Sequence, residues 1–274
     1  MPQFLSQLGA TQRLLREALA AALAPDTRSR RSAGAGDAGG ANDGVAHPLQ
    51  LGDTPITLQV RSSGPGGLRY LNLHENEQTA VLAAADLLQT VPGQLIELRS
   101  RGRRVVSFRD GLRPLAFDPN RIFSDAGIRQ TLRRHASCTP AAQQALRALR
   151  DRVLALIEGP PDQAVVALHN NRAGLYSILH YQPGGAHAAE AQALAVNPRL
   201  APEDFCLVTR ANLFEPLREQ GFNVVLQADH PSDDGSLSVW FGQQRRAYVN
   251  VEALHGHRAE QHRMLAAVAA LHGG

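Results

Sequence analysis

The sequence predicts an α/β fold with a central mixed, mostly parallel sheet that is flanked by helices. Two observations support this prediction. Short, continuous apolar segments, typical of strands buried on both faces, recur after residue 45. Longer segments with helical periodicity lie between several of them. In such a fold, ligand sites lie at the ends of strands, so the polar residues that follow each strand are the first candidates for function.

Strand-like and helix-like segments alternate after residue 45. Strands are expected at 56–60, 68–73, 94–98, 104–108, 164–168, 205–208, 223–227, 237–241 and 247–251. Helices are expected at 78–89, 140–157 and 259–271, with a further one at 212–219. Thr139 is the expected N-cap of the second helix, because its hydroxyl can accept a hydrogen bond from a free backbone N–H. The glycine-rich segment 63–67 predicts a hairpin turn.

The first 44 residues differ in composition from the rest. Residues 3–24 predict one amphipathic helix, and residues 26–44 have the Arg, Ser, Ala, Gly and Asp content of a flexible linker. We therefore expect an N-terminal helix and linker over 1–44 and a single domain over 45–274.

Bulk composition excludes several classes of protein. Hydrophobic residues make up 43% of the chain and charged residues 19%, with a net charge of +3. The dense basic segment 99–104 has no interleaved aromatic residues, so it indicates a solvated strand end or loop, and no nucleic-acid partner is expected. No stretch approaches the ~20 apolar residues of a membrane span, so no membrane partner is expected. Cys138 and Cys206 are too few for a disulfide framework.

The compartment follows from the N-terminal segment. Charges interrupt the apolar residues 15–25, which makes a poor signal-peptide core. A cytoplasmic location is therefore expected. Export to the periplasm is the alternative, because Ala22-Leu23-Ala24 resembles a cleavage site.

The segment His74-Glu75-Asn76-Glu77 lies between an expected strand and an expected helix. A histidine and a carboxylate three residues apart can bind one metal ion, and imidazole suits Zn²⁺. His169 and Glu252 each follow an expected strand. Taken singly, each is more commonly a packed or surface residue. Together they complete the set that a mononuclear hydrolase needs, which is two histidines, a carboxylate ligand and an unliganded glutamate as base.

Four segments, in order, resemble the zinc carboxypeptidase and aspartoacylase/succinylglutamate desuccinylase superfamily. The His74 segment is similar to the His-x-x-Glu motif, above all to the His-Gly-Asn-Glu form of the deacylases. Residues 118–123 (DPNRIF) resemble the Asp-x-Asn-Arg segment, and Leu168-His169-Asn170 resembles the strand-end histidine. Val251-Glu252 resembles the strand-end glutamate.

The resemblance implies a zinc-carboxypeptidase-like catalytic domain. In it, Zn²⁺ would be bound by His74, Glu77 and His169. Glu252 would serve as general base, taking a proton from the zinc-bound water and returning it to the departing amine.

The resemblance also implies a substrate carboxylate bound by Arg121 and Asn120. The planar guanidinium of arginine suits a bidentate pair with a carboxylate. A surface ion pair between Arg121 and Asp118 or Asp125 is the alternative.

Three departures from the family pattern bear on activity. Deacylases have an aspartate two residues before the third ligand, and here that position is Ala167. The arginine that polarises the substrate carbonyl has three candidates, Arg103, Arg104 and Arg113, and the sequence does not separate them. No tyrosine obviously matches the substrate-capping tyrosine of carboxypeptidases.

Two further residues are candidates for substrate contact. Asn170 lies beside the third ligand, although an asparagine in a turn needs no such role. His255 would belong to a polar lip of the same cleft. A second metal site formed by His255, His257 and His262 is the less favoured interpretation.

The sequence thus predicts a zinc-dependent hydrolase that cleaves an amide or peptide bond next to a free carboxylate, as a carboxypeptidase does. Its expected partner is a small peptide or an acyl-amino acid. Two alternatives stay open. One is an N-acyl amino-acid deacylase, and the other is a non-catalytic protein that binds carboxylates or peptides on the same fold.

Overall fold

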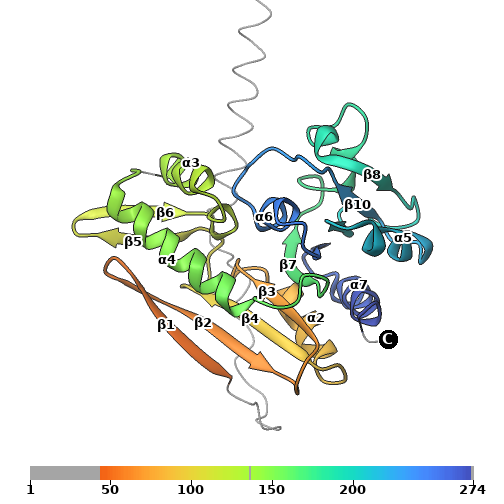
Figure 1. Cartoon of the computed structure of the whole chain (residues 1–274), viewed down its shortest axis with the longest axis horizontal. Helices are drawn as coiled ribbons and strands as arrows, with labels where there is room; N and C mark the ends of the chain where they lie inside the picture. The colour runs from red at the N-terminus through yellow and green to blue at the C-terminus, as the bar shows by residue number, and fades with distance from the viewer. Residues whose placement is uncertain (1–43, 136, 273–274) are drawn as a thin grey trace, which may run out of the picture. The chain divides into compact units, whose positions relative to one another are not determined.

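The structure is a computed structural model, which describes residues 44–135 and 137–272 (Figure 1). The strands are β1 Val45–Leu51, β2 Thr54–Ser62, β3 Leu68–Asn72, β4 Gly93–Arg99, β5 Val106–Asp110, β6 Arg113–Phe117, β7 Val165–Asn171, β8 Ala191–Ala195, β9 Phe205–Val208, β10 Val224–Gln227 and β11 Tyr248–Leu254. The α-helices are α2 Gln78–Leu87, α3 Asp125–His135, α4 Pro140–Leu156, α5 Ala211–Glu219, α6 Leu237–Gln243 and α7 Arg258–Ala270. Short 3₁₀ helices are η2 Pro119–Arg121, η3 Ile178–Tyr181 and η4 Ala188–Glu190.

Nine strands form one sheet in the order β1-β2-β4-β3-β7-β11-β9-β10-β8, and β5 pairs with β6 apart from it. The expected α/β fold with a mixed sheet is confirmed. Pairing is parallel through the centre, from β4 across β3 and β7 to β11. It is antiparallel between β2 and β4 and between β9 and β11. Because β3, β7 and β11 run in one direction, their carboxyl ends meet at the same edge of the sheet.

Helices cover both faces of the sheet (Figure 1). On one face α2, α5 and α7 pack against side chains such as Val166 and Leu168 of β7. On the other face α3, α4, α6 and the β5–β6 hairpin pack against Val165 and Ala167. Successive residues of a strand point to opposite faces, so His169 continues the series of Val165 and Ala167.

Several predicted helix and strand boundaries are confirmed, but one segment predicted as a strand is a helix. Thr139 caps α4 as expected, since its side chain accepts from the backbone N–H of Ala142 at 3.1 Å. The strand predicted at 237–241 is the helix α6. Ser236 is its N-cap, and the Ser236 side chain accepts a hydrogen bond from the backbone N–H of Val239.

The predicted hairpin turn at 63–67 is also wrong. β2 pairs with β4 and not with β3, so this segment crosses from one strand to a non-adjacent one. Gly67 has φ 72°, and a Cβ there would overlap the carbonyl oxygen of Pro92. The crossing therefore requires a residue without a side chain at this point.

Two N-terminal predictions lie outside the described residues. These are the helix at 3–24 and the linker at 26–44, apart from Gly44, so the domain boundary stays a prediction. Within residues 44–135 and 137–272, no helix has the length and apolar character that crossing a membrane requires.

Candidate metal centre

His74 and Glu77 meet because the chain turns tightly between β3 and α2. The backbone N–H of Glu77, the N-cap of α2, donates to the carbonyl of His74 at 2.9 Å. This turn brings His74 Nδ1 to 3.1 Å from Glu77 Oε1, and both side chains are fully buried. A carboxylate at the start of a helix is favoured by the positive end of the helix dipole.

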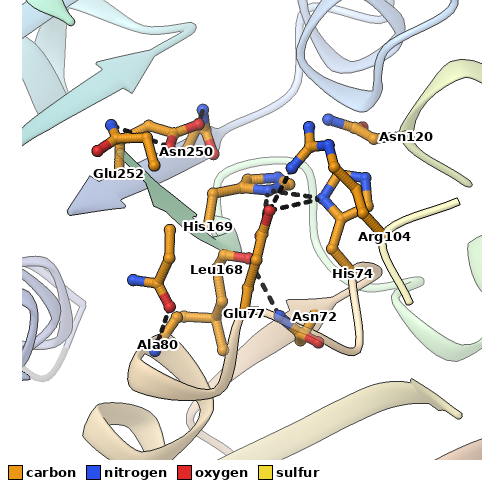
Figure 2. A network of polar contacts seen from close by, with 12 residues as sticks. Asn72, His74, Glu77, Ala80, Arg104, Asn120, Leu168, His169, Asn250 and Glu252 are labelled. Carbon is orange, nitrogen blue, oxygen red and sulfur yellow. Dashed lines mark hydrogen bonds and ion pairs between the residues drawn. The ribbon is translucent and has the colours of Figure 1, made fainter. Parts of the chain in front are cut away.

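His169 reaches the same point from β7 (Figure 2). Its Nδ1 lies 2.9 Å from Glu77 Oε2 and 3.3 Å from His74 Nδ1. Ligand atoms of these three buried residues all lie within 4.8 Å of one another. The residues predicted as metal ligands are therefore brought together by the fold.

The donor set fits a metal ion in type and in spacing. Two nitrogens bound to one Zn²⁺ at about 2.0–2.1 Å with tetrahedral angles would lie roughly 3.3 Å apart. The two Nδ1 atoms are 3.3 Å apart. Two imidazole nitrogens and one carboxylate oxygen leave a fourth tetrahedral position for water or substrate, as in catalytic sites.

Asp118 contacts His74 on the side of the ring that faces away from Glu77. Its Oδ1 lies 2.9 Å from His74 Nε2, the ring nitrogen that does not face Glu77. A carboxylate on this nitrogen holds the ring in one tautomer and leaves Nδ1 free to bind a metal. The backbone N–H of Asp118 donates to Thr131 Oγ1, which fixes the aspartate against α3. Sequence reasoning offered Asp118 only as a possible partner of Arg121.

Of the three candidate arginines, Arg104 is the one at this site. Arg104 Nη1 forms an ion pair with Glu77 Oε1. Arg103 and Arg113 are exposed on the loop after β4 and on β6. Figure 2 shows the Arg104 side chain on the His74 side of Glu77.

The electrostatics of the cluster favour its charged form. Burial raises the pKa of Glu77, but His74, His169 and Arg104 outweigh burial and hold the pKa well below its ordinary value. Burial lowers the pKa of His74, yet Glu77 and Asp118 bring the net pKa above the ordinary value. A proton and a metal ion therefore compete for the ligand atoms of this cluster.

Glu252 is the cross-strand neighbour of His169. The two residues are paired in register between the parallel strands β11 and β7, so their side chains leave the same face of the sheet. Asn250 Nδ2 donates to Glu252 Oε1 at 3.1 Å, and Asn171 Nδ2 lies 3.5 Å from Oε2. Burial raises the pKa of Glu252 above its ordinary value. A buried carboxylate with a raised pKa is suited to proton transfer.

Ala167 lies at the position where the deacylases that the sequence resembles have an aspartate. Ala167 is paired with Asn250 across the β7–β11 ladder. The ladder thus carries an alanine and an asparagine at this point in place of a carboxylate. Asn250 directs its amide toward Glu252.

The predicted carboxylate-binding pair lies on η2. Arg121 Nη1 donates to the carbonyl of Asn120, and Nη2 is 3.5 Å from an exposed Asp234 carboxylate. Of the Arg121 side chain, 37% is exposed. Asn120 Oδ1 accepts from the backbone N–H of Leu237. Arg121 is therefore paired at the surface, but its partner is Asp234, and the predicted partners Asp118 and Asp125 pair elsewhere.

Of the two further candidates for substrate contact, Asn170 lies away from the cluster, and the role of His255 stays a prediction. The strand predicted to end at residue 168 continues to Asn171, so Asn170 points to the face opposite His169. There Asn170 Oδ1 accepts from the N–H of Ala80, and Nδ2 donates to Gln261 Oε1. The prediction for Asn170 is therefore corrected to a structural role. His255 lies exposed in the turn after β11.

Comparisons with known proteins give only distant likenesses. No family model matches the chain, and no curated protein sequence matches it. Solved structures of two proteins provisionally named metallopeptidases are similar to it. The one from Shewanella denitrificans has 12% identity over 82% of each chain, with a TM-score of 0.36. The one from Shewanella amazonensis has 15% identity over 83% of this chain and 85% of that chain, with a TM-score of 0.36.

A second protein of Shewanella amazonensis is also similar. It is provisionally named a succinylglutamate desuccinylase/aspartoacylase family protein, and it shares 11% identity over 83% of this chain and 72% of that chain, with a TM-score of 0.37. Likenesses at this level assign neither a family nor an activity.

Proposed function

We propose that this protein is a metal-dependent hydrolase that cleaves an amide or peptide bond next to a free carboxylate. One observation carries the proposal. Three buried side chains, His74, Glu77 and His169, converge with metal-ligand spacing, and Glu252 stands in register beside one of them. A purely structural metal site needs no such unliganded carboxylate.

Zn²⁺ is the ion that two imidazoles and a carboxylate suit best, and it would supply a Lewis acid and lower the pKa of a water molecule to about 7. The ligands would be His74 Nδ1, His169 Nδ1 and the carboxylate of Glu77. Asp118 would keep His74 in the required tautomer.

Glu252 would move the proton. Its carboxylate would accept a proton from the attacking water and then deliver it to the departing amine nitrogen. A raised pKa serves both steps, because a stronger base takes the proton more readily and the acid form is populated closer to neutrality. Asn250 would fix the direction of Oε1.

Arginines would bind the substrate at two points. Glu77 pairs with Nη1 of Arg104, and other guanidinium N–H groups would bind the substrate carbonyl oxygen, where negative charge develops. Arg121 would bind the free carboxylate, since its contact with Asp234 is between exposed groups and therefore weak.

The central test is Glu252→Gln in the full chain. We expect zinc content to be unchanged and hydrolysis to fall by about 10²–10⁴-fold, the usual contribution of a general base. His74→Ala and His169→Ala should instead lose bound zinc in elemental analysis. Equal zinc in both histidine variants and the parent would exclude these ligands, and unchanged turnover of Glu252→Gln would exclude the base.

A panel of short peptides and N-acyl amino acids, each with a free carboxylate and assayed with added zinc, would identify the substrate class. Turnover of peptides would favour the carboxypeptidase form of the proposal, and turnover of acyl-amino acids the deacylase form. Binding of these ligands without turnover would indicate a non-catalytic protein.

A further inference from the structure

Arg104 is carried on the loop that joins β4 to β5. β4 is parallel to β3, so its carboxyl end lies at the edge of the sheet where His74 and Glu77 follow β3. The loop begins at Ser100 and ends before Val106, the first residue of β5. Its course decides whether the Arg104 guanidinium reaches Glu77.

Glu75 holds this loop through two backbone contacts. Its Oε2 accepts from the N–H of Ser100 at 2.5 Å and from the N–H of Gly102 at 2.6 Å. Its Oε1 is 3.9 Å from Arg99 Nη1. Hydrogen bonds to an ionised carboxylate are about twice as strong as those between neutral groups.

The turn that Glu75 holds has an uncommon backbone conformation. Arg101 has φ 68° and Gly102 has φ 70°, both in the left-handed region. This region is disfavoured for a residue with a side chain, so Arg101 needs surrounding contacts to stay there. The two N–H groups bound by Glu75 lie on either side of Arg101 and supply such contacts.

We propose that Glu75 is a positioning residue that fixes the turn 100–102 and thereby places Arg104 for its role in hydrolysis. The inference rests on the proposed function for the role of Arg104. Within the tetrapeptide 74–77, Glu75 binds the backbone of the loop, and Glu77 binds the guanidinium two residues beyond the turn. The segment that supplies two metal ligands thus also orients the arginine beside them.

A double-mutant cycle tests whether Glu75 acts through Arg104. Arg104→Ala should lower kcat/KM by about 10²-fold or more, as for loss of an oxyanion donor. Glu75→Ala should lower it by about tenfold in the parent but by less than about twofold in the Arg104→Ala background, because residues that act as a unit are not additive. Glu75→Gln, which keeps one acceptor oxygen, should recover part of the loss. Zinc content should stay at the parent level in all of these variants.

Tryptic cleavage gives a readout that needs no turnover. The bonds after Arg101, Arg103 and Arg104 lie in the loop, and a protease cuts a loop faster when it opens more often. With the full chain and fragments assigned by mass spectrometry, Glu75→Ala should be cut at these bonds about tenfold faster than the parent. The matched control is Glu215→Ala, which removes an exposed glutamate paired with Arg218 on α5 and should leave the rates unchanged.

The outcomes distinguish the proposed hydrolysis from the proposed positioning role of Glu75. Equal cleavage rates in Glu75→Ala and the parent, or an equal loss of kcat/KM in both backgrounds of the cycle, would overturn the role of Glu75. If no substrate is turned over by the parent while cleavage of the Glu75→Ala loop is accelerated, the proposed hydrolysis fails and the control of the turn by Glu75 stands.

Discussion

Replacing Asp118 by asparagine should weaken metal binding without removing a ligand. The substitution keeps the shape of the side chain but removes the charge that faces His74 Nε2 across 2.9 Å. Burial makes this contact stronger than a surface pair, since 0% of His74 and 20% of Asp118 are exposed. Loss of such a supporting group typically costs 10–100-fold in metal affinity, or about 1.4–2.7 kcal/mol.

The assay is competition for zinc between the protein and a chromogenic chelator. The pH should be well above the raised pKa of His74, so that proton competition does not enter the comparison. Asp125→Asn is the matched control, because it makes the same change on an exposed residue that pairs with Arg147 and Arg150. A zinc dissociation constant of Asp118→Asn equal to those of the parent and the control would refute the supporting role of Asp118.

The site and the core of the domain support three further predictions. Glu252 must be ionised to act as base, so kcat/KM should fall as the pH falls through the raised pKa of Glu252. Asn250→Ala removes a hydrogen bond that lowers this pKa, so the acid limb of the pH profile of kcat/KM should move to higher pH. Arg121→Ala should abolish the preference for a substrate with a free carboxylate over its amide, a preference of about 10–100-fold for a charged hydrogen bond; equal rates of the parent on both substrates would contradict it. Leu146→Ala in the core should lower the free energy of unfolding in urea by about 2–5 kcal/mol, whereas Leu112→Ala, at a site 93% exposed, should change it by less than about 0.5 kcal/mol.

The convergence of the predicted metal ligands could be anticipated in part from the fold class and from the order of the segments that resemble the superfamily. Parallel strands end at one edge, which could be predicted, whereas the adjacency of β3, β7 and β11 that brings these polar residues together is seen only in the structure. His74 and Glu77 are also close in sequence, and one tight turn fixes their relative position.

The positions that sequence reasoning missed depend on details of the backbone. The orientation of Asn170 depends on whether β7 stops at residue 168 or continues by three residues, because each added residue reverses the face. The choice of Arg104 over Arg103 and Arg113 depends on which side chain reaches Glu77, and the course of the loop after β4, with its left-handed turn at Arg101, is not revealed by any apolar pattern. The segment that forms α6 is as short and as apolar as a buried strand, and the N-cap residue Ser236 is the signal that distinguishes it from one.

The contacts of Asn170 have a consequence for how His169 is held in place. Adjacent residues of β7 serve opposite layers, since His169 turns to the metal cluster while Asn170 binds the N–H of Ala80, in the first turn of α2. Asn170 also binds Gln261 of α7. The strand that carries His169 is therefore held, at the next residue, by two helices on the opposite face of the sheet. The place of His169 in the cluster thus depends on the packing of α2 and α7 as well as on its own contacts.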